Sequence, residues 1–141
     1  QFLSTYNRQE KDQFREFILK RDKNLNANNI KFIEINSTKL INFFKKIKFD
    51  LIWVDGDHHD PQVTIDIINS INLIKKDGII CIDDVVKDKN FRKNKYVSNE
   101  SFSSLDLLEK NKIIKNIYIH KRIRKCNYKT EKYIAISKLY N

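Results

Sequence analysis

The sequence predicts an α/β protein with a mostly parallel sheet that ends in an antiparallel hairpin. Apolar runs and helical spacings alternate along most of the chain, which is typical of parallel strands joined by crossover helices. Two short apolar runs, 49–54 and 79–82, are each followed directly by aspartates. The last two apolar runs are joined by a link too short for a crossover helix, so we expect that pair to be antiparallel.

The N-terminal part is expected to hold a helix, a strand and a second, short helix. Aromatic and aliphatic residues recur at helical spacing over residues 8–21, after cap candidates in residues 4–7. Residues 30–35 have the apolar content of a strand. Ser37 is the expected cap of a short helix that ends near residue 47.

The middle of the chain predicts two strands with a helix between them. The strands are the apolar runs at 49–54 and 79–82. Asp60 followed by Pro61 is typical of a helix start, with the aspartate as the cap and the proline in the first turn. We expect that helix to run to about Lys75 and to stop before Gly78.

A long polar loop at 87–100 separates this part from the C-terminal elements. Its length favours a functional role, such as a lid, over a simple connection. A helix at 102–111 and strands at 113–123 and 132–139 follow from the apolar spacing.

Composition limits the class of protein. The 141 residues are enough for one domain, which we place at 1–141, and 40% of them are hydrophobic. The net charge of +10 is spread along the chain, so nucleic-acid binding is not expected, and the densest basic segment, 120–125, is interpreted as a solvated edge. Cys81 and Cys126 do not form a disulfide framework, and no apolar run has the length of a membrane span, so the cytoplasm is the expected location.

Asp55, Asp83 and Asp84 are the first candidates for chemistry. They follow buried strands, and ligands of open α/β sheets bind at the carboxyl ends of the strands. Asp83 and Asp84 are adjacent and repel each other unless a cation or hydrogen-bond donors lie between them. Asp57 and His58 have an alternative interpretation as turn residues that bond to the backbone.

The segments 49–58 (FDLIWVDGDH) and 76–85 (KDGIICIDDV) resemble the second half of class I S-adenosylmethionine-dependent methyltransferases, especially the small-molecule O-methyltransferase branch. The resemblance extends from about Ile30 to Leu139 and includes the terminal hairpin. It implies a Rossmann-like sheet with helices on both faces. It also implies a small molecule as methyl acceptor and S-adenosylmethionine as cofactor.

The resemblance assigns cofactor-binding roles by position. Asn36 and Ser37 fall where the family contacts the adenine side of the cofactor. Asp55, together with Gly56, Asp57 and His58, falls near the methionine part.

The resemblance also assigns a metal site and a base. In metal-dependent members of the family, the positions of Asp55, Asp83 and Asp84 bind a divalent cation, and Mg²⁺ is the expected ion because it prefers a few carboxylates and several waters. Such a cation would lower the pKa of a bound hydroxyl group. His58 falls where related enzymes carry a catalytic lysine, and an imidazole can accept a proton near neutral pH.

The chain departs from the family in its N-terminal half. Gly56 and Gly78 are its only glycines, so the glycine-rich loop that approaches the cofactor has no counterpart. The chain contains no methionine and starts at Gln1. We therefore expect a piece of a longer chain that lacks the first two strands of the family, with weak cofactor binding. With those strands missing, we expect either exposed sheet edges or direct pairing of 30–35 with 49–54.

Two other functions remain open. A Mg²⁺-dependent phosphoacceptor domain also has three aspartates at strand ends, but there the acidic pair comes first in the chain, and here it comes last. A non-catalytic basic module would bind nucleic acid or a protein through the terminal hairpin and would show strong salt dependence.

Overall fold

The computed structural model describes residues 8–91, 97–121 and 131–140. The chain divides into two compact units, residues 1–35 and 36–141, and each is described by itself. None of the helices in the described residues is both long and apolar enough to cross a membrane. The expected cap residues at 4–7 and Cys126 lie outside the described residues.

The described residues of the first unit, 8–35, contain one helix, α1 (Arg8–Leu25). The predicted helix is confirmed, and it continues four residues beyond the expected end at Arg21, to Leu25. The predicted strand at 30–35 is wrong, because this segment is irregular. It also does not pair with 49–54, and an extended segment without a neighbouring strand has no backbone ladder to hold it in place.

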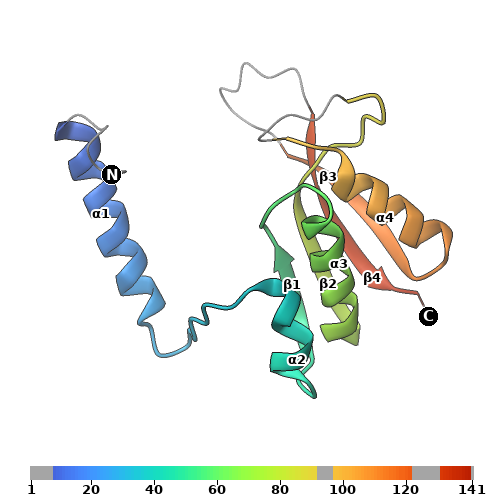
Figure 1. Ribbon diagram of the computed structural model, residues 1–141, viewed down its shortest axis with the longest axis horizontal. Helices are drawn as coiled ribbons and strands as arrows, with labels where there is room; N and C mark the ends of the chain where they lie inside the picture. The colour runs from blue at the N-terminus through green and yellow to red at the C-terminus, as the bar shows by residue number, and fades with distance from the viewer. Residues whose placement is uncertain (1–7, 92–96, 122–130, 141) are drawn as a thin grey trace. The chain divides into compact units, whose positions relative to one another are not determined.

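The second unit is built on a four-stranded sheet with the order β1-β2-β4-β3 (Figure 1). The β1–β2 pair is parallel, and the β2–β4 and β3–β4 pairs are antiparallel. The mixed α/β fold and the terminal hairpin are confirmed, although the parallel part is one pair, because 30–35 does not join the sheet. The strands are β1 (Phe49–Val54), β2 (Ile74–Val85), β3 (Ile114–Lys121) and β4 (Lys132–Leu139).

The helices of the second unit lie at the predicted positions, but several caps and ends differ. The expected cap Asp60 is wrong, because Pro61 is the N-cap of α3, and α2 ends at Phe44 and not near residue 47. Asn36, and not Ser37, caps the first turn, because its Oδ1 accepts hydrogen bonds from the Thr38 amide at 3.0 Å and the Thr38 hydroxyl at 2.7 Å. α3 ends at Leu73 and β2 begins at Ile74, so the residues just before Gly78, where the helix was expected to end, belong to the strand. The helices are η2 (Ser37–Lys39), α2 (Leu40–Phe44), α3 (Gln62–Leu73) and α4 (Glu100–Lys110).

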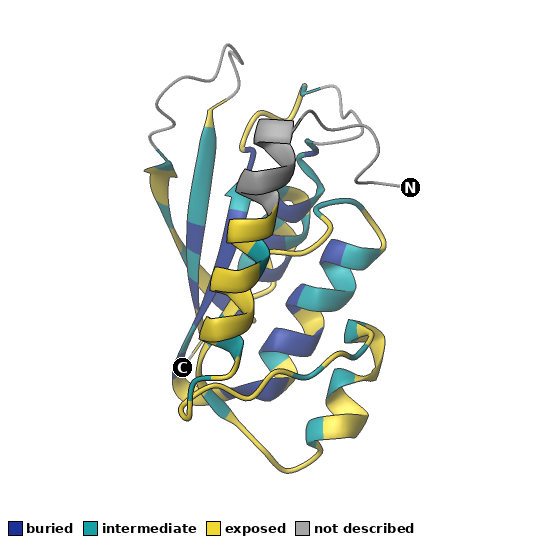
Figure 2. Cartoon of the chain, turned by 90° about the vertical axis from the view of Figure 1, so that its left-hand side faces the viewer, coloured by how far each residue is buried: buried dark blue, intermediate teal, exposed yellow. Residues whose placement is uncertain are grey.

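The core lies between one face of this sheet and the helices α3 and α4. Ile80 and Ile82 of β2 and Ala135 of β4 are fully or almost fully buried and belong to the same cluster as Ile67 of α3 and Leu105 of α4. Figure 2 shows the buried residues concentrated between sheet and helices. The hydrophobic effect of this burial holds the layers together.

Within this unit, α3 and α4 cover one face of the sheet, and apolar side chains on the other face are exposed. Trp53 of β1 is 52% exposed. Leu51, Ile117 and Ile119 alternate with the buried positions of their strands and are also exposed. The sequence predicts helices on both faces of the sheet. Among the described residues of this unit, helices cover one face.

Candidate functional site

The carboxyl ends of β1 and β2 lie at the same edge of the sheet, because the two strands are parallel (Figure 1). Val54 pairs with Ile82 in this parallel pair, so the next residues, Asp55 and Asp83, lie at the same height along the two strands. The loop 55–61 and the end of β2 therefore leave the sheet side by side. This is the edge at which α/β sheets bind ligands.

The loop after β1 contains a closed turn formed by Asp57 and His59. One carboxylate oxygen of Asp57 accepts a hydrogen bond of 3.0 Å from the His59 amide and lies 2.9 Å from the His59 ring Nδ1. The backbone hydrogen bond, followed by the imidazole contact, lowers the pKa of Asp57 below its ordinary value. The interpretation of Asp57 as a turn residue that bonds to the backbone is confirmed, and His59 supplies both of its contacts.

The same loop is fixed to the start of α4. The hydroxyl group of Ser98 donates a hydrogen bond to the backbone oxygen of His58, and Ser98 is only 1% exposed. The amide of Asp60 donates a hydrogen bond of 2.8 Å to the Glu100 carboxylate. These bonds join segments 40 residues apart in the sequence, so the loop has a defined position.

Two predicted site residues have polar atoms without a partner among the described residues. The carboxylate of Asp55 is exposed and makes no hydrogen bond or ion pair there. The Nδ1 atom of His58 is buried and has no hydrogen-bond partner. A buried polar atom without a partner costs free energy, which is a common feature of functional sites.

Two polar side chains of α3 lie between the adenine-side candidate Ser37 and the loop residue Gly56. Gln62 donates hydrogen bonds to the Ser37 hydroxyl at 2.6 Å and to the Asp66 carboxylate at 2.8 Å. The other oxygen of Asp66 would lie 3.4 Å from a Cβ atom placed on Gly56. Asn69 also donates a hydrogen bond of 2.7 Å to the backbone oxygen of Ser37. The structure thus brings Ser37 and Gly56 to one place through the first turns of α3.

Asp83 and Asp84 are bound by two lysines. Lys121 Nζ lies 2.8 and 2.7 Å from the two Asp83 oxygens and 2.8 Å from Asp84 Oδ1, and Lys132 Nζ lies 2.5 Å from Asp84 Oδ2. Burial raises the pKa of Asp84, but the hydrogen bonds from the two ammonium groups outweigh it, and the net pKa is lowered. No group of three or more acidic, histidine or cysteine residues in the described parts of the chain could hold a metal ion. The structure therefore does not assemble Asp55 with this pair into a ligand set.

The sequence-based reasoning missed Gln62, Asp66, Lys121 and Lys132. The spacing of Gln62 and Asp66, four residues apart directly after the candidate loop, is a signal that could have identified them. Lys121 lies in the basic segment 120–125, which was interpreted as a solvated edge. Its partners are 37 and 38 residues away, and no local pattern indicates them.

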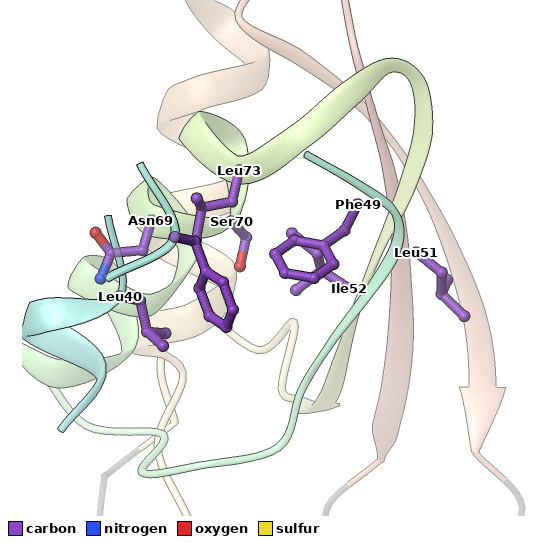
Figure 3. Close-up of a pocket in the computed structure, with 8 residues that line it drawn as sticks. Leu40, Phe49, Leu51, Ile52, Asn69, Ser70 and Leu73 are labelled. Carbon is purple, nitrogen blue, oxygen red and sulfur yellow. The ribbon is translucent and has the colours of Figure 1, made fainter. Parts of the chain in front are cut away.

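An apolar cavity of about 230 Å³ lies beside the first part of β1 (Figure 3). Leu40 of α2, Phe49 and Ile52 of β1, and Leu73 of α3 are among the residues around it. Phe49 is the first residue of β1 and Ile52 lies in its middle, so the cavity follows the first part of the strand and stops short of Asp55. Most of its lining is apolar, and Asn69, which bonds to the Ser37 backbone oxygen, also lines it.

The fold and the position of the site define a class of protein. A parallel β1–α3–β2 unit, polar loops at its carboxyl ends, the helix α4 and an antiparallel final hairpin form the class I fold of S-adenosylmethionine-dependent methyltransferases. A sequence model of a methyltransferase domain matches residues 3–85, more than half of the chain. The chain belongs to this methyltransferase family.

Solved structures show the same fold at low sequence identity. Cofactor-bound Rv0187 from MTB has a TM-score of 0.64 at 15% identity, covering 81% of this chain and 50% of that one. A putative O-methyltransferase from Klebsiella pneumoniae has a TM-score of 0.59 at 14% identity, with coverages of 79% and 50%. The precorrin-6y C5,15-methyltransferase from Geobacter metallireducens has a TM-score of 0.52 at 15% identity, with coverages of 89% and 61%.

The chain spans about half the length of the first two of these structures. No curated protein sequence matches the chain significantly.

Proposed function

We propose that this chain forms one side of an S-adenosylmethionine site and takes part in methyl transfer to the oxygen of a small molecule. The observation that carries the proposal is the hydrogen-bonded series of Ser37, Gln62 and Asp66, which ends beside Gly56. The preceding residue in the loop, Asp55, has a carboxylate without a partner among the described residues. The likeness to a putative O-methyltransferase supports oxygen as the acceptor atom. Because the methyltransferase family match includes residues of both units, we propose one domain over 1–141, and we keep the cytoplasm as its location.

The proposed cofactor contacts divide between two segments. Asn36 and Ser37 face the adenine side, and their backbone is fixed by the cap on Thr38 and by the hydrogen bonds from α3. Asp55 and Gly56 face the methionine part, where the carboxylate would accept hydrogen bonds from the ammonium group of the cofactor. Asp57 acts mainly by closing the turn that places these residues.

His58 is the proposed base for the acceptor hydroxyl group. Its backbone is held by Ser98, and its Nδ1 atom is buried without a partner among the described residues. An imidazole group can accept a proton near neutral pH. Removing the hydroxyl proton increases the nucleophilicity of the oxygen, and the remaining requirement is alignment with the methyl group.

Metal assistance does not fit the donor set of this chain. A divalent cation bound by Asp83 and Asp84 requires free carboxylate oxygens, and both carboxylates are engaged by lysine ammonium groups. We therefore assign no step of the reaction to Mg²⁺.

The proposal is tested by titrating the ¹⁵N-labelled chain with S-adenosylmethionine and following the amide signals. We expect weak binding, in the range of about 0.1–10 mM, because the chain has no glycine-rich loop to approach the cofactor. The largest shifts should occur at residues 36–37 and 55–58. Shifts confined to the hairpin β3–β4, or no shifts at saturating cofactor, would contradict the proposal.

A further inference from the structure

The acidic pair at the end of β2 is part of a four-residue ionic cluster, which consists of Asp83, Asp84, Lys121 and Lys132. The cluster is partly buried, since the side chains of Asp83 and Asp84 are 12% and 24% exposed. Each of the four carboxylate oxygens lies within hydrogen-bond distance of an ammonium group. Two positive and two negative charges are thus balanced inside the cluster.

The cluster joins three strands. Lys121 is the last residue of β3, Lys132 is the first residue of β4, and the two are direct cross-strand partners. Like charges in such a position repel each other, as do the adjacent carboxylates of β2. Among the described residues, each like-charged pair is stabilised by the other pair, so the four side chains form one unit.

The cluster is incompatible with a bound divalent cation at the same carboxylates. Mg²⁺ binds oxygen at about 2.0–2.1 Å, so its binding would require both lysines to leave. The lysines would also repel the cation, because their charge lies within about 3 Å of the oxygens that it needs.

We propose that Lys121 and Lys132 occupy the place of a divalent cation beside Asp83 and Asp84, so that the acidic pair is neutralised from within the chain and excludes metal. The exclusion of metal follows from the cluster itself. Only its consequence, methyl transfer without a metal, rests on the function proposed above. The test therefore measures metal binding, which is separate from cofactor binding.

Mn²⁺ is a suitable probe, because its paramagnetism broadens the amide signals of nearby residues. In the unaltered chain, about 1 mM Mn²⁺ should cause no selective broadening at residues 82–85, since no carboxylate oxygen of the pair is free. In the variant Lys121→Met/Lys132→Met the acidic pair loses its counter-charges. Its affinity for Mn²⁺ should rise at least about tenfold, with broadening at 82–85.

The charge-conserving variant Lys121→Arg/Lys132→Arg is the matched control, and it should exclude Mn²⁺ like the unaltered chain. If the double methionine variant does not fold, Lys132→Met alone, which frees one oxygen of Asp84, should show a smaller gain of the same kind. Selective broadening of residues 82–85 in the unaltered chain would overturn the proposal. The absence of a gain in the folded methionine variants would overturn it as well.

Discussion

The ammonium group of Lys121 donates hydrogen bonds to both carboxylate oxygens of Asp83, at 2.8 and 2.7 Å, across 38 residues of sequence. This contact attaches the β3–β4 hairpin, at the end where β3 leads on to β4, to the carboxyl end of β2. The same edge of the sheet carries the loop 55–61 and the proposed cofactor contacts. The hairpin, which is distant in sequence, thereby determines the charge beside the candidate site.

Replacing Ser98 by alanine should destabilise the protein by about 1–3 kcal/mol, because the buried hydroxyl group donates to the His58 backbone oxygen. Urea-induced unfolding measures this loss. The control is Ser103→Ala on the exposed surface of α4, which should change the free energy of unfolding by less than about 0.5 kcal/mol. Equal effects of the two substitutions would show that the Ser98 contact does not hold the loop.

Tyr118→Phe should leave the protein equally stable at pH 8, or more stable by up to about 1 kcal/mol. The Tyr118 hydroxyl group is buried without a partner among the described residues, whereas its ring packs on Phe102 at 5.7 Å between centroids and would be retained. Unfolding in urea measures the change, with Tyr140→Phe at an exposed position as the control. A loss of stability beyond about 1 kcal/mol would mean that the hydroxyl group has a stabilising partner.

Tyr118→Phe should also change how the free energy of unfolding depends on pH above about pH 9.5. Burial, followed by the negative charges of Glu109 and Asp106, raises the pKa of Tyr118 to about 12 from its ordinary value of 10.0. The folded state therefore disfavours the phenolate, and this residue contributes a loss of stability as the pH rises above 10.0 towards 12. Tyr118→Phe should lose stability less steeply than Tyr140→Phe between pH 9.5 and about 11. Parallel pH profiles would contradict the raised pKa.

The sequence was sufficient for the elements that depend on local pattern. The strand 49–54, the helix after Pro61 and the final hairpin have clear apolar periodicity and turn signals, and all three are present. The strand at 30–35 was predicted from its apolar content alone, and it is not formed, because a strand also requires a neighbour in the sheet. Apolar content alone also does not give the side of the sheet: Trp53 lies in the apolar run 49–54, and its side chain belongs to the exposed face.

The candidate site was predictable only in part. The position of Asp55 at the end of a parallel strand follows from the chain order and is confirmed by the pairing of Val54 with Ile82. The lysines that bind Asp83 and Asp84 come from the hairpin, and their approach depends on the order β2-β4-β3 in the sheet. Sequence alone does not give this order, so the acidic pair was interpreted as a metal site.

The affinity of the chain for S-adenosylmethionine before and after Asp55→Asn tests the proposed site most directly. Asp50→Asn is the matched control, because Asp50 lies at the opposite end of the same strand and its 83% exposed side chain bonds to Lys75. We predict that Asp55→Asn weakens binding at least about tenfold, since a charge-assisted hydrogen bond is lost, and that Asp50→Asn changes it less than about twofold. Unchanged binding in Asp55→Asn would contradict the site.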